Sequence, residues 1–194
     1  MCPRCGSLGR QRVDWLFLTD RTDLIDRPQR LLHVAPETCF RRNLQTRANI
    51  SYLSADYDSA LAMEHMDVTD IQYPADSFDA VICNHVLEHV TDDRKAMREI
   101  LRVLRPGGWA LLQVPLDDSR AATFEDPSIT APRDRARIFG QFDHLRVYGR
   151  DYRQRLAEQG FDVTVNEFAK ELPATMLERF GLDADETIYL CWKR

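Results

Sequence analysis

Glycine is scarce in this chain of 194 residues, and none occurs between Gly9 and Gly107. Any turn in that interval that brings backbone close to a ligand must form without the residue that adopts positive φ most freely. Long apolar runs are also missing, since the longest stretches fall far short of the roughly 18 to 20 residues of a membrane span. These absences predict a protein without membrane segments, whose ligand-binding turns are unusual.

The first residues, MCPRCGSLGRQR, contain no apolar run of the kind that a secretory signal needs, so we expect a cytoplasmic protein. The formal net charge of -5 argues against sequence-independent binding to nucleic acid, which depends on a basic surface. We expect a small-molecule partner, and neither nucleic acid nor membrane. Residues 1–194 are predicted to form a single domain, because this length buries one substantial core, and its oligomeric state is left open.

The cysteines are few and do not suggest a disulfide framework, because their number is odd and their spacing irregular. Two of them lie in the N-terminal segment 1–12 with the spacing of zinc ligands, since two thiolates separated by two residues can share one tetrahedral ion. No second CxxC and no HxxxH follows, so two idle thiols are favoured over zinc. The five are predicted to be reduced: Cys2, Cys5, Cys39, Cys83 and Cys191.

Strand and helix patterns alternate almost from end to end, which is typical of a doubly wound, mostly parallel α/β sheet. Thr91 is expected to cap one helix, and Pro106, Gly107 and Gly108 to end it. The long polar segment 117–140 breaks the alternation and is predicted to be a substrate lid or an insertion. Strands are expected at 30–35, 49–56, 80–84, 109–116, 161–168 and 186–194, with a short one before Asp67, and helices at 11–20, 37–47, 91–108 and 149–160.

Ligands of such sheets bind at the carboxyl ends of the strands, and that rule selects the residues to consider. Asp56 lies 19 residues beyond Glu37, close to the spacing at which an acid after the second strand meets ribose hydroxyls. The two carboxylate oxygens match a vicinal diol. Because acids commonly end strands, this spacing alone does not decide between the functional and the structural interpretation.

The stretch MDVTDIQYPADSFDAVICNHVLEHV, followed by a helix that closes in LRPGG, resembles the class I S-adenosylmethionine-dependent methyltransferases of type 11 between about Leu31 and Pro115. The resemblance implies a Rossmann-like seven-stranded sheet with one antiparallel C-terminal strand. It also implies S-adenosyl-L-methionine as cofactor. By this resemblance Asp67 and Val68 hold the adenine, whereas Asn84 and His85 lie beside the methionine part.

The turn after the first strand departs from the glycine-rich pattern of that family and reads His33-Val34-Ala35-Pro36-Glu37. In one interpretation this turn still binds the cofactor. Ala35 has the smallest side chain with a Cβ, Pro36 fixes φ near the value of a first helical turn, and Glu37 offers a carboxylate to the cofactor's ammonium.

In the other interpretation the loss of glycine means loss of binding, and only the scaffold survives. We favour binding, because Asp56, Asp67 and Asn84 remain together at the strand ends. Tyr57, next to Asp56, completes the predicted cofactor site.

The whole chain also resembles a bacterial subgroup of these enzymes in which an HVAPE-type turn recurs, with CPRCGSLGRQR at the start and FGQFDHLRVYGRDY near the end. Longer members of that subgroup carry a further CxxC that would complete a zinc ribbon. This chain lacks it, so the zinc site is not carried over to Cys2 and Cys5.

Methyl transfer from a sulfonium needs positioning and exclusion of water, and a base only where the acceptor must lose a proton. Asp143 and His144 lie just beyond the predicted lid, and His144 is the candidate base. Arg146 and Tyr148 are the candidate substrate-binding residues, Arg146 through a substrate carboxylate or phosphate. A hydrogen-bonded surface pair is the competing interpretation of Asp143 and His144.

Two further histidines, His85 and His89, are four residues apart, a spacing that allows them to share one helical face. Since no other ligand is near in sequence, packing against the cofactor or the sheet is favoured over metal binding.

Three functions follow from the sequence. The first is methyl transfer from S-adenosyl-L-methionine to O or N of a small polar molecule. The second is another use of the sulfonium, such as cyclisation or elimination, which the unusual turn motivates. The third is a non-catalytic binding or regulatory module on the same scaffold, for which the missing glycines argue.

Overall fold

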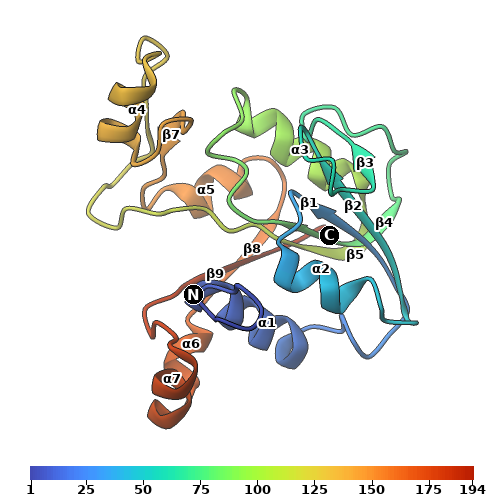
Figure 1. Cartoon of the computed structure of the whole chain (residues 1–194). Helices are drawn as coiled ribbons and strands as arrows, with labels where there is room; N and C mark the ends of the chain where they lie inside the picture. Colours follow the sequence, from blue (N-terminus) through green and yellow to red (C-terminus); the bar gives the residue numbers. More distant parts are fainter.

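A seven-stranded sheet forms the centre of the computed structural model, which describes residues 1–194 (Figure 1). The strand order is β3-β2-β1-β4-β5-β9-β8; the first five run parallel, and β9 is antiparallel to both of its neighbours. This confirms the predicted α/β class and sheet. The strands are β1 (Gln29–Val34), β2 (Ile50–Asp56), β3 (Glu64–His65), β4 (Phe78–Cys83), β5 (Leu104–Leu111), β8 (Asp162–Asn166) and β9 (Ile188–Trp192).

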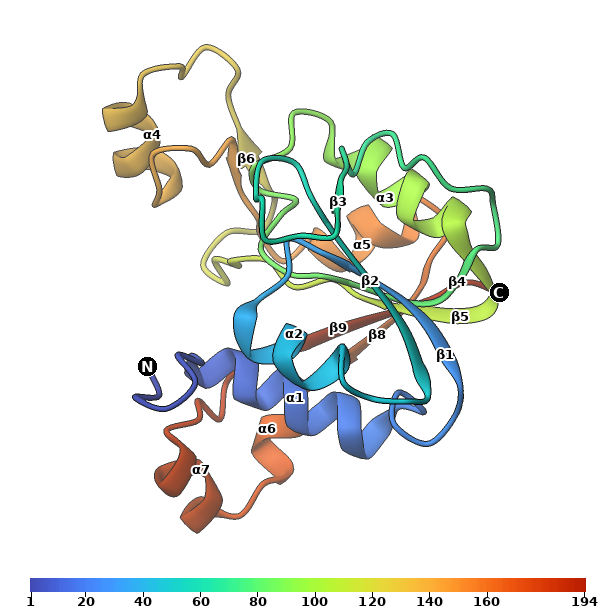
Figure 2. The same ribbon diagram turned by 45° about the vertical axis from the view of Figure 1, so that its right-hand side comes forward.

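Helices cover both faces of this sheet (Figure 2). On one face lie α1 (Gly9–Arg21), α2 (Thr38–Leu44) and α6 (Phe168–Glu171), and on the other α3 (Asp93–Val103) and α5 (Tyr152–Ala157). A further helix, α7 (Ala174–Phe180), follows α6. Side chains of β1 alternate between two apolar clusters, Leu31 packing with the first set of helices and Leu32 with the second. Both faces of the central strands are therefore buried.

The register of the parallel strands brings their carboxyl ends to one edge. Val34 at the end of β1 pairs with Ala55 on one side and with Cys83 on the other. Because parallel strands end on the same side, the turns that follow β1, β2 and β4 lie next to one another. The edge of the sheet thus gathers three polar segments that are distant in sequence.

The boundaries of α3 differ from those predicted. Asp92, and not Thr91, is the N-cap, because its carboxylate accepts a hydrogen bond from the Lys95 backbone N–H at 2.8 Å. The helix ends at Val103, and Pro106 to Gly108 lie within β5. A Cβ at Gly108 would lie 2.7 Å from the Asp79 carbonyl oxygen, so glycine here permits close strand pairing and not a helix end.

Residues 117–147 form an arm that extends away from the sheet at the upper left of Figure 1. It contains β6 (Phe124–Glu125), α4 (Pro132–Phe139) and β7 (Arg146–Val147), and β6 pairs with β7. The sequence predicted the irregular segment but none of these elements. A lid function for 117–140 stays a prediction.

The sequence predicts that no segment crosses a membrane. None of the helices in the structure combines the length and the apolar character needed to cross a bilayer.

Candidate active site

A cavity of ≈ 780 Å³ opens at the carboxyl ends of β1, β2 and β4, and we call it the strand-end pocket. This volume is in the range of small-molecule and cofactor sites. Seven of the ten residues predicted to bind the cofactor line it: Val34, Ala35, Asp56, Tyr57, Asp67, Val68 and His85. Lys95 and Asp92 at the start of α3 also line it, and sequence patterns did not single them out.

In the turn after β1, a strained alanine occupies the position where glycine would be expected. Ala35 has φ 48°, in the left-handed region that glycine favours, and its N–H donates to the Ala55 carbonyl at 2.8 Å. Pro36 lies outside the helix, since Glu37 is the N-cap and α2 begins at Thr38. The smallest side chain with a Cβ thus occupies the place where backbone approaches the pocket.

Three predicted cofactor residues form a hydrogen-bonded group behind that turn. His33 is fully buried at the end of β1; its Nε2 is 2.7 Å from Glu37 Oε2 and its Nδ1 3.0 Å from the Tyr52 hydroxyl. Asn84 Nδ2 donates to Glu37 Oε1 at 3.3 Å. None of the three lines the strand-end pocket. His33 and Asn84 each contact one oxygen of the Glu37 carboxylate and so hold it in place.

The acids after β2 and β3 each shape their own turn while facing the pocket. Asp56 Oδ1 accepts from the backbone N–H groups of Asp58 and Ser59, both at 2.8 Å. Asp67 Oδ1 accepts from Thr69 N–H at 2.8 Å. One oxygen of each carboxylate is left for a ligand, and the buried Val68 adds an apolar wall. A vicinal diol and an adenine ring match this arrangement, so the residues fit S-adenosyl-L-methionine.

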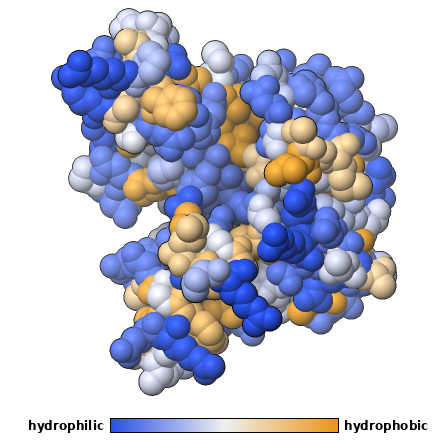
Figure 3. Space-filling view, in the orientation of Figure 1, coloured by the Kyte–Doolittle hydropathy of each residue, from blue (hydrophilic) through white to orange (hydrophobic).

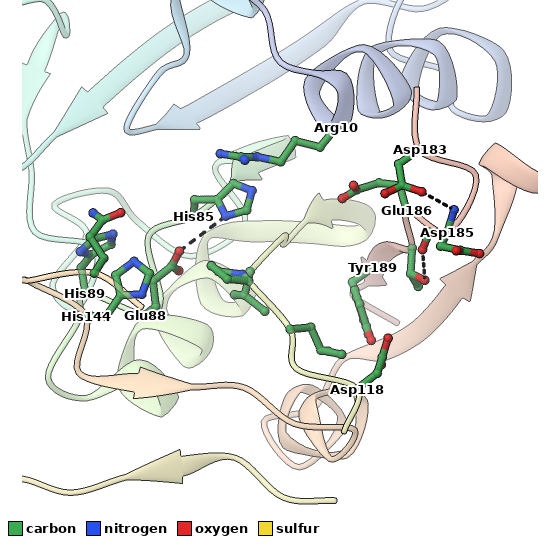
Figure 4. Close-up of a pocket in the computed structure, with 15 residues that line it drawn as sticks. Arg10, His85, Glu88, His89, Asp118, His144, Asp183, Asp185, Glu186 and Tyr189 are labelled. Carbon is green, nitrogen blue, oxygen red and sulfur yellow. Dashed lines mark hydrogen bonds and ion pairs between the residues drawn. The ribbon is translucent and has the colours of Figure 1, made fainter. Parts of the chain in front are cut away.

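A second cavity of ≈ 610 Å³ adjoins the first and shares His85 and His89 with it (Figure 4). We call it the composite pocket, because its walls come from α1, the turn after β4, the segment after β5, the arm and the segment after α7. Figure 3 shows the molecule hollowed between the arm and the region of α6 and α7, with hydrophilic surface inside. Its charged and polar lining includes one arginine and five carboxylates: Arg10, Glu88, Asp118, Asp183, Asp185 and Glu186.

His144 lines this pocket, and neither His144 nor Asp143 pairs with the other. The His144 Nδ1 is 3.1 Å from the Phe139 carbonyl oxygen, whereas Asp143 Oδ2 is 3.2 Å from His89 Nδ1. His85 and His89 lie in a turn and not on a helix, with His85 at φ 54°. Three histidines therefore surround the boundary between the pockets.

Arg146 and Tyr148 do not line either cavity, which corrects the expectation that they contact substrate. Arg146 is 3 % exposed, and its guanidinium donates to the Leu87, Val90 and Thr91 carbonyl oxygens at 2.6, 2.5 and 3.0 Å. Since its donors are used within the chain, Arg146 clamps the turn after β4 to the arm.

The hydroxyl of Tyr148 is likewise used internally, in a buried ionic group around Asp93. Tyr148 donates to Asp93 Oδ2 at 2.7 Å, and Arg155 donates to both Asp93 oxygens at 2.7 and 2.6 Å. Burial alone would raise the pKa of Asp93, but the Arg155 hydrogen bonds, the Arg146 charge and the Tyr148 hydroxyl lower it below its ordinary range. The group is structural, and it supports the base of the arm.

The N-terminal cysteines lie apart from these residues. Cys5 is exposed, and hydrogen bonds with Ser7 lower the pKa of its thiol to about 7. Cys2 and Cys5 do not belong to a cluster of three potential metal ligands. By contrast, burial raises the pKa of the Cys83 thiol, as expected of a small apolar side chain at the end of a buried strand.

Comparison with known sequences identifies one family. Residues 22–112 match the family described as "Methyltransferase domain". The demethylmenaquinone methyltransferase of Clavibacter sepedonicus is 45% identical over 51 residues, 26% of this chain and 21% of that protein. The 27-O-demethylrifamycin SV methyltransferase of Amycolatopsis mediterranei is 40% identical over 62 residues, 32% of this chain and 23% of that protein. The matched segments span about a fifth of the length of these relatives.

Solved structures resemble the chain over nearly all of its length. An S-adenosylmethionine-dependent methyltransferase from Mesorhizobium loti superposes with a TM-score of 0.61 at 15% identity, covering 93% of this chain and 98% of that one. The [4+2]-cyclase SpnF superposes with a TM-score of 0.62 at 18% identity, covering 95% and 81%. These likenesses concern the fold. Over residues 22–112 the chain is therefore similar to the methyltransferase domain family, and the solved structures share its fold.

Proposed function

We propose that this chain transfers a methyl group from S-adenosyl-L-methionine to an oxygen or nitrogen of a small polar molecule. The observation that carries the proposal is the pair of adjoining cavities. The strand-end pocket offers the two acids and the apolar wall that fit the cofactor, and the composite pocket next to it offers room for an acceptor. The bound cofactor would supply the activated methyl group.

The residues of the chain would then bind, orient and exclude water. Asp56 would accept from ribose hydroxyls, and Asp67 and Val68 would hold the adenine. Glu37 lies outside both cavities, which corrects the expectation that it meets the cofactor; held by His33 and Asn84, it is proposed to position the turn that carries Ala35 into the pocket. His85 and His89, which line both cavities, separate cofactor from acceptor.

The lining of the composite pocket supports a polar acceptor. Only three of its fifteen lining residues are hydrophobic, and its five carboxylates outnumber its one arginine. A polar, neutral or cationic molecule fits such a lining, whereas an apolar quinone of the kind named by one relative fits it less well. The other relative is named as a methyltransferase of a 27-O-demethyl compound, which agrees with an oxygen acceptor.

Isothermal titration with S-adenosylhomocysteine tests cofactor binding. We expect binding by the parent chain and a loss of at least about tenfold in Asp56→Asn, because a hydrogen bond to a charged group contributes about 1.5 to 3 kcal/mol. Asp162→Asn is the matched control, since Asp162 pairs with Arg194 at the surface outside both cavities. No binding of either cofactor form by the parent chain would remove the proposal and favour a non-catalytic scaffold.

A second use of the cofactor remains a distinct candidate, because one structure with this fold is a cyclase. Incubation of the chain with S-adenosyl-L-methionine and candidate acceptors separates the two. Methyl transfer releases S-adenosylhomocysteine in step with methylated acceptor. Turnover without S-adenosylhomocysteine would favour cyclisation or elimination.

A further inference from the structure

We propose that Glu88, His89 and His144 bind a divalent transition-metal ion in the composite pocket. Their potential ligand atoms all lie within 4.8 Å of one another. Two imidazoles and one carboxylate form the protein ligand set of many catalytic zinc sites and of other open divalent sites. The sequence favoured packing for His89 because no third ligand was near; the fold supplies it from residue 144.

Glu88 is the strongest indication of a missing partner. Its side chain is 1 % exposed, and neither carboxylate oxygen has a hydrogen-bond partner. The nearest cationic group is His85, whose Nδ1 is 3.5 Å from Glu88 Oε1, too distant to satisfy the carboxylate. Buried carboxylates are ordinarily paired, hydrogen-bonded or bound to a metal, because an isolated buried charge is costly. An ion at this point would satisfy both oxygens.

Both histidines have an acceptor close to Nδ1. The Nδ1 of His144 is 3.1 Å from a carbonyl oxygen, which only accepts, so the Nδ1 carries the proton. The Nδ1 of His89 is 3.2 Å from the Asp143 carboxylate, which fixes the same tautomer. In each neutral ring Nε2 is left with its lone pair for a ligand. Such carbonyl and carboxylate partners are the usual outer support of metal-binding histidines.

The backbone holds the three ligands in place before any ion arrives. Leu145 N–H donates to the Glu88 carbonyl oxygen at 2.8 Å, which ties the two segments that carry the ligands together. The Arg146 guanidinium donates to Leu87, Val90 and Thr91 on either side of Glu88 and His89. A preorganised site loses little conformational entropy on binding.

The open side of the cluster gives the ion a role, and this step rests on the proposed function. Three protein ligands leave coordination positions facing the cavity of ≈ 610 Å³. A hydroxyl of the acceptor bound there would lose its proton to water more readily, since a divalent ion lowers the pKa of a coordinated O–H. The resulting oxygen would form the bond to the methyl carbon as the carbon–sulfur bond breaks and its electron pair goes to sulfur.

Metal titration tests the site without cofactor or acceptor. The full chain carrying Cys2→Ser and Cys5→Ser, which removes the N-terminal thiols, is stripped of metal and titrated with Zn²⁺ by calorimetry and with Co²⁺ by visible absorption. We expect one ion per chain and Co²⁺ ligand-field bands. Glu88→Gln and His144→Ala should each weaken binding by at least about tenfold. His65→Ala is the matched control, because His65 is exposed on β3 and outside the cluster.

The outcomes separate this site from the proposed function. No bound ion, or binding that survives both substitutions, overturns the metal site. If either variant fails to fold, the metal-induced rise in Tm of the parent chain, compared with that of the nearly isosteric His144→Gln, decides the question. Binding of S-adenosylhomocysteine without any bound ion would remove only the metal site, and an ion bound without any cofactor affinity would remove only the methyltransferase proposal.

Discussion

The two pockets share His85 and His89, yet they are built in different ways. The strand-end pocket takes its wall from the segments that follow β1, β2, β3 and β4, and several of these contributions are visible as a polar residue at the end of a predicted strand. The composite pocket needs residues from both ends of the chain, such as Arg10 and Glu186. A site made by strand order can be read from local patterns, whereas a site made by the docking of an arm cannot.

The largest expected effect concerns the clamp that makes the composite pocket. Arg146→Met should lower the free energy of unfolding by about 3 to 5 kcal/mol, because it leaves the buried Asp93 carboxylate with one cation fewer and three carbonyl groups without a donor. Urea denaturation measures the loss. Arg194→Met, which breaks an exposed ion pair, should cost no more than about 1 kcal/mol.

The same variant distinguishes a structural arginine from a substrate-binding one. If Arg146→Met unfolds at the same urea concentration as the parent chain but binds acceptor more weakly, the guanidinium contacts substrate as the sequence predicted.

Next in size is a change in the turn of the strand-end pocket. Ala35→Val should destabilise the chain by about 1 to 3 kcal/mol, since a β-branched side chain is strained at φ 48°. Its added methyl groups would also enter the pocket and weaken binding of S-adenosylhomocysteine. Ala131→Val is the control, an exposed alanine with φ -70° outside both cavities. Equal effects at the two positions, by urea denaturation and calorimetry, would show that the turn is unstrained.

Asp14 is a buried acid of α1. Burial, with the Glu37 and Glu186 carboxylates, raises its pKa well above the ordinary range. The folded state therefore holds this proton more tightly than the unfolded state does. The stability it contributes is fully present below the ordinary pKa of about 4 and is lost as pH rises through the folded pKa.

Asp14→Asn should consequently raise the unfolding free energy at pH 8, by about 1 kcal/mol, and the gain should vanish as the pH falls toward about 4. Urea midpoints at several pH values measure this. Asp20→Asn, on the exposed side of the same helix, should show no such pH dependence. A gain that is constant with pH would mean that loss of charge is not its cause.

The smallest effect is expected when the family's usual residue is restored. Ala35→Gly relieves the left-handed strain but adds freedom to the unfolded chain, so the two terms nearly cancel and stability should change by less than about 1 kcal/mol. Ala136→Gly, at an exposed position inside α4, should instead destabilise by about 1 kcal/mol. A large gain in cofactor affinity in Ala35→Gly would show that the alanine turn binds the cofactor less well than a glycine turn does.

Local patterns mark where the strands end, and the strand-end pocket lies at those ends. Asp56 ends one predicted strand, Asp67 and Val68 follow the next, and the strand order brings them together. The roles of Arg146 and Tyr148 were wrongly predicted for the opposite reason. A charged or phenolic side chain in a loop has the same sequence pattern whether it faces a ligand or the Asp93 group, and only burial distinguishes the two.

The sequence by itself determined the α/β class, the seven strands and the edge at which the strand-end pocket opens, because period, apolar runs and strand ends are local properties of the chain. Tertiary structure decided which side chains meet across that edge. It placed Ala35 at a positive φ, directed the Arg146 guanidinium to backbone carbonyl groups and brought His144 beside Glu88 and His89. The outcomes for Arg146 and His144 depend on how the arm packs against the turn after β4, a contact between residues more than fifty positions apart whose energy no local pattern encodes.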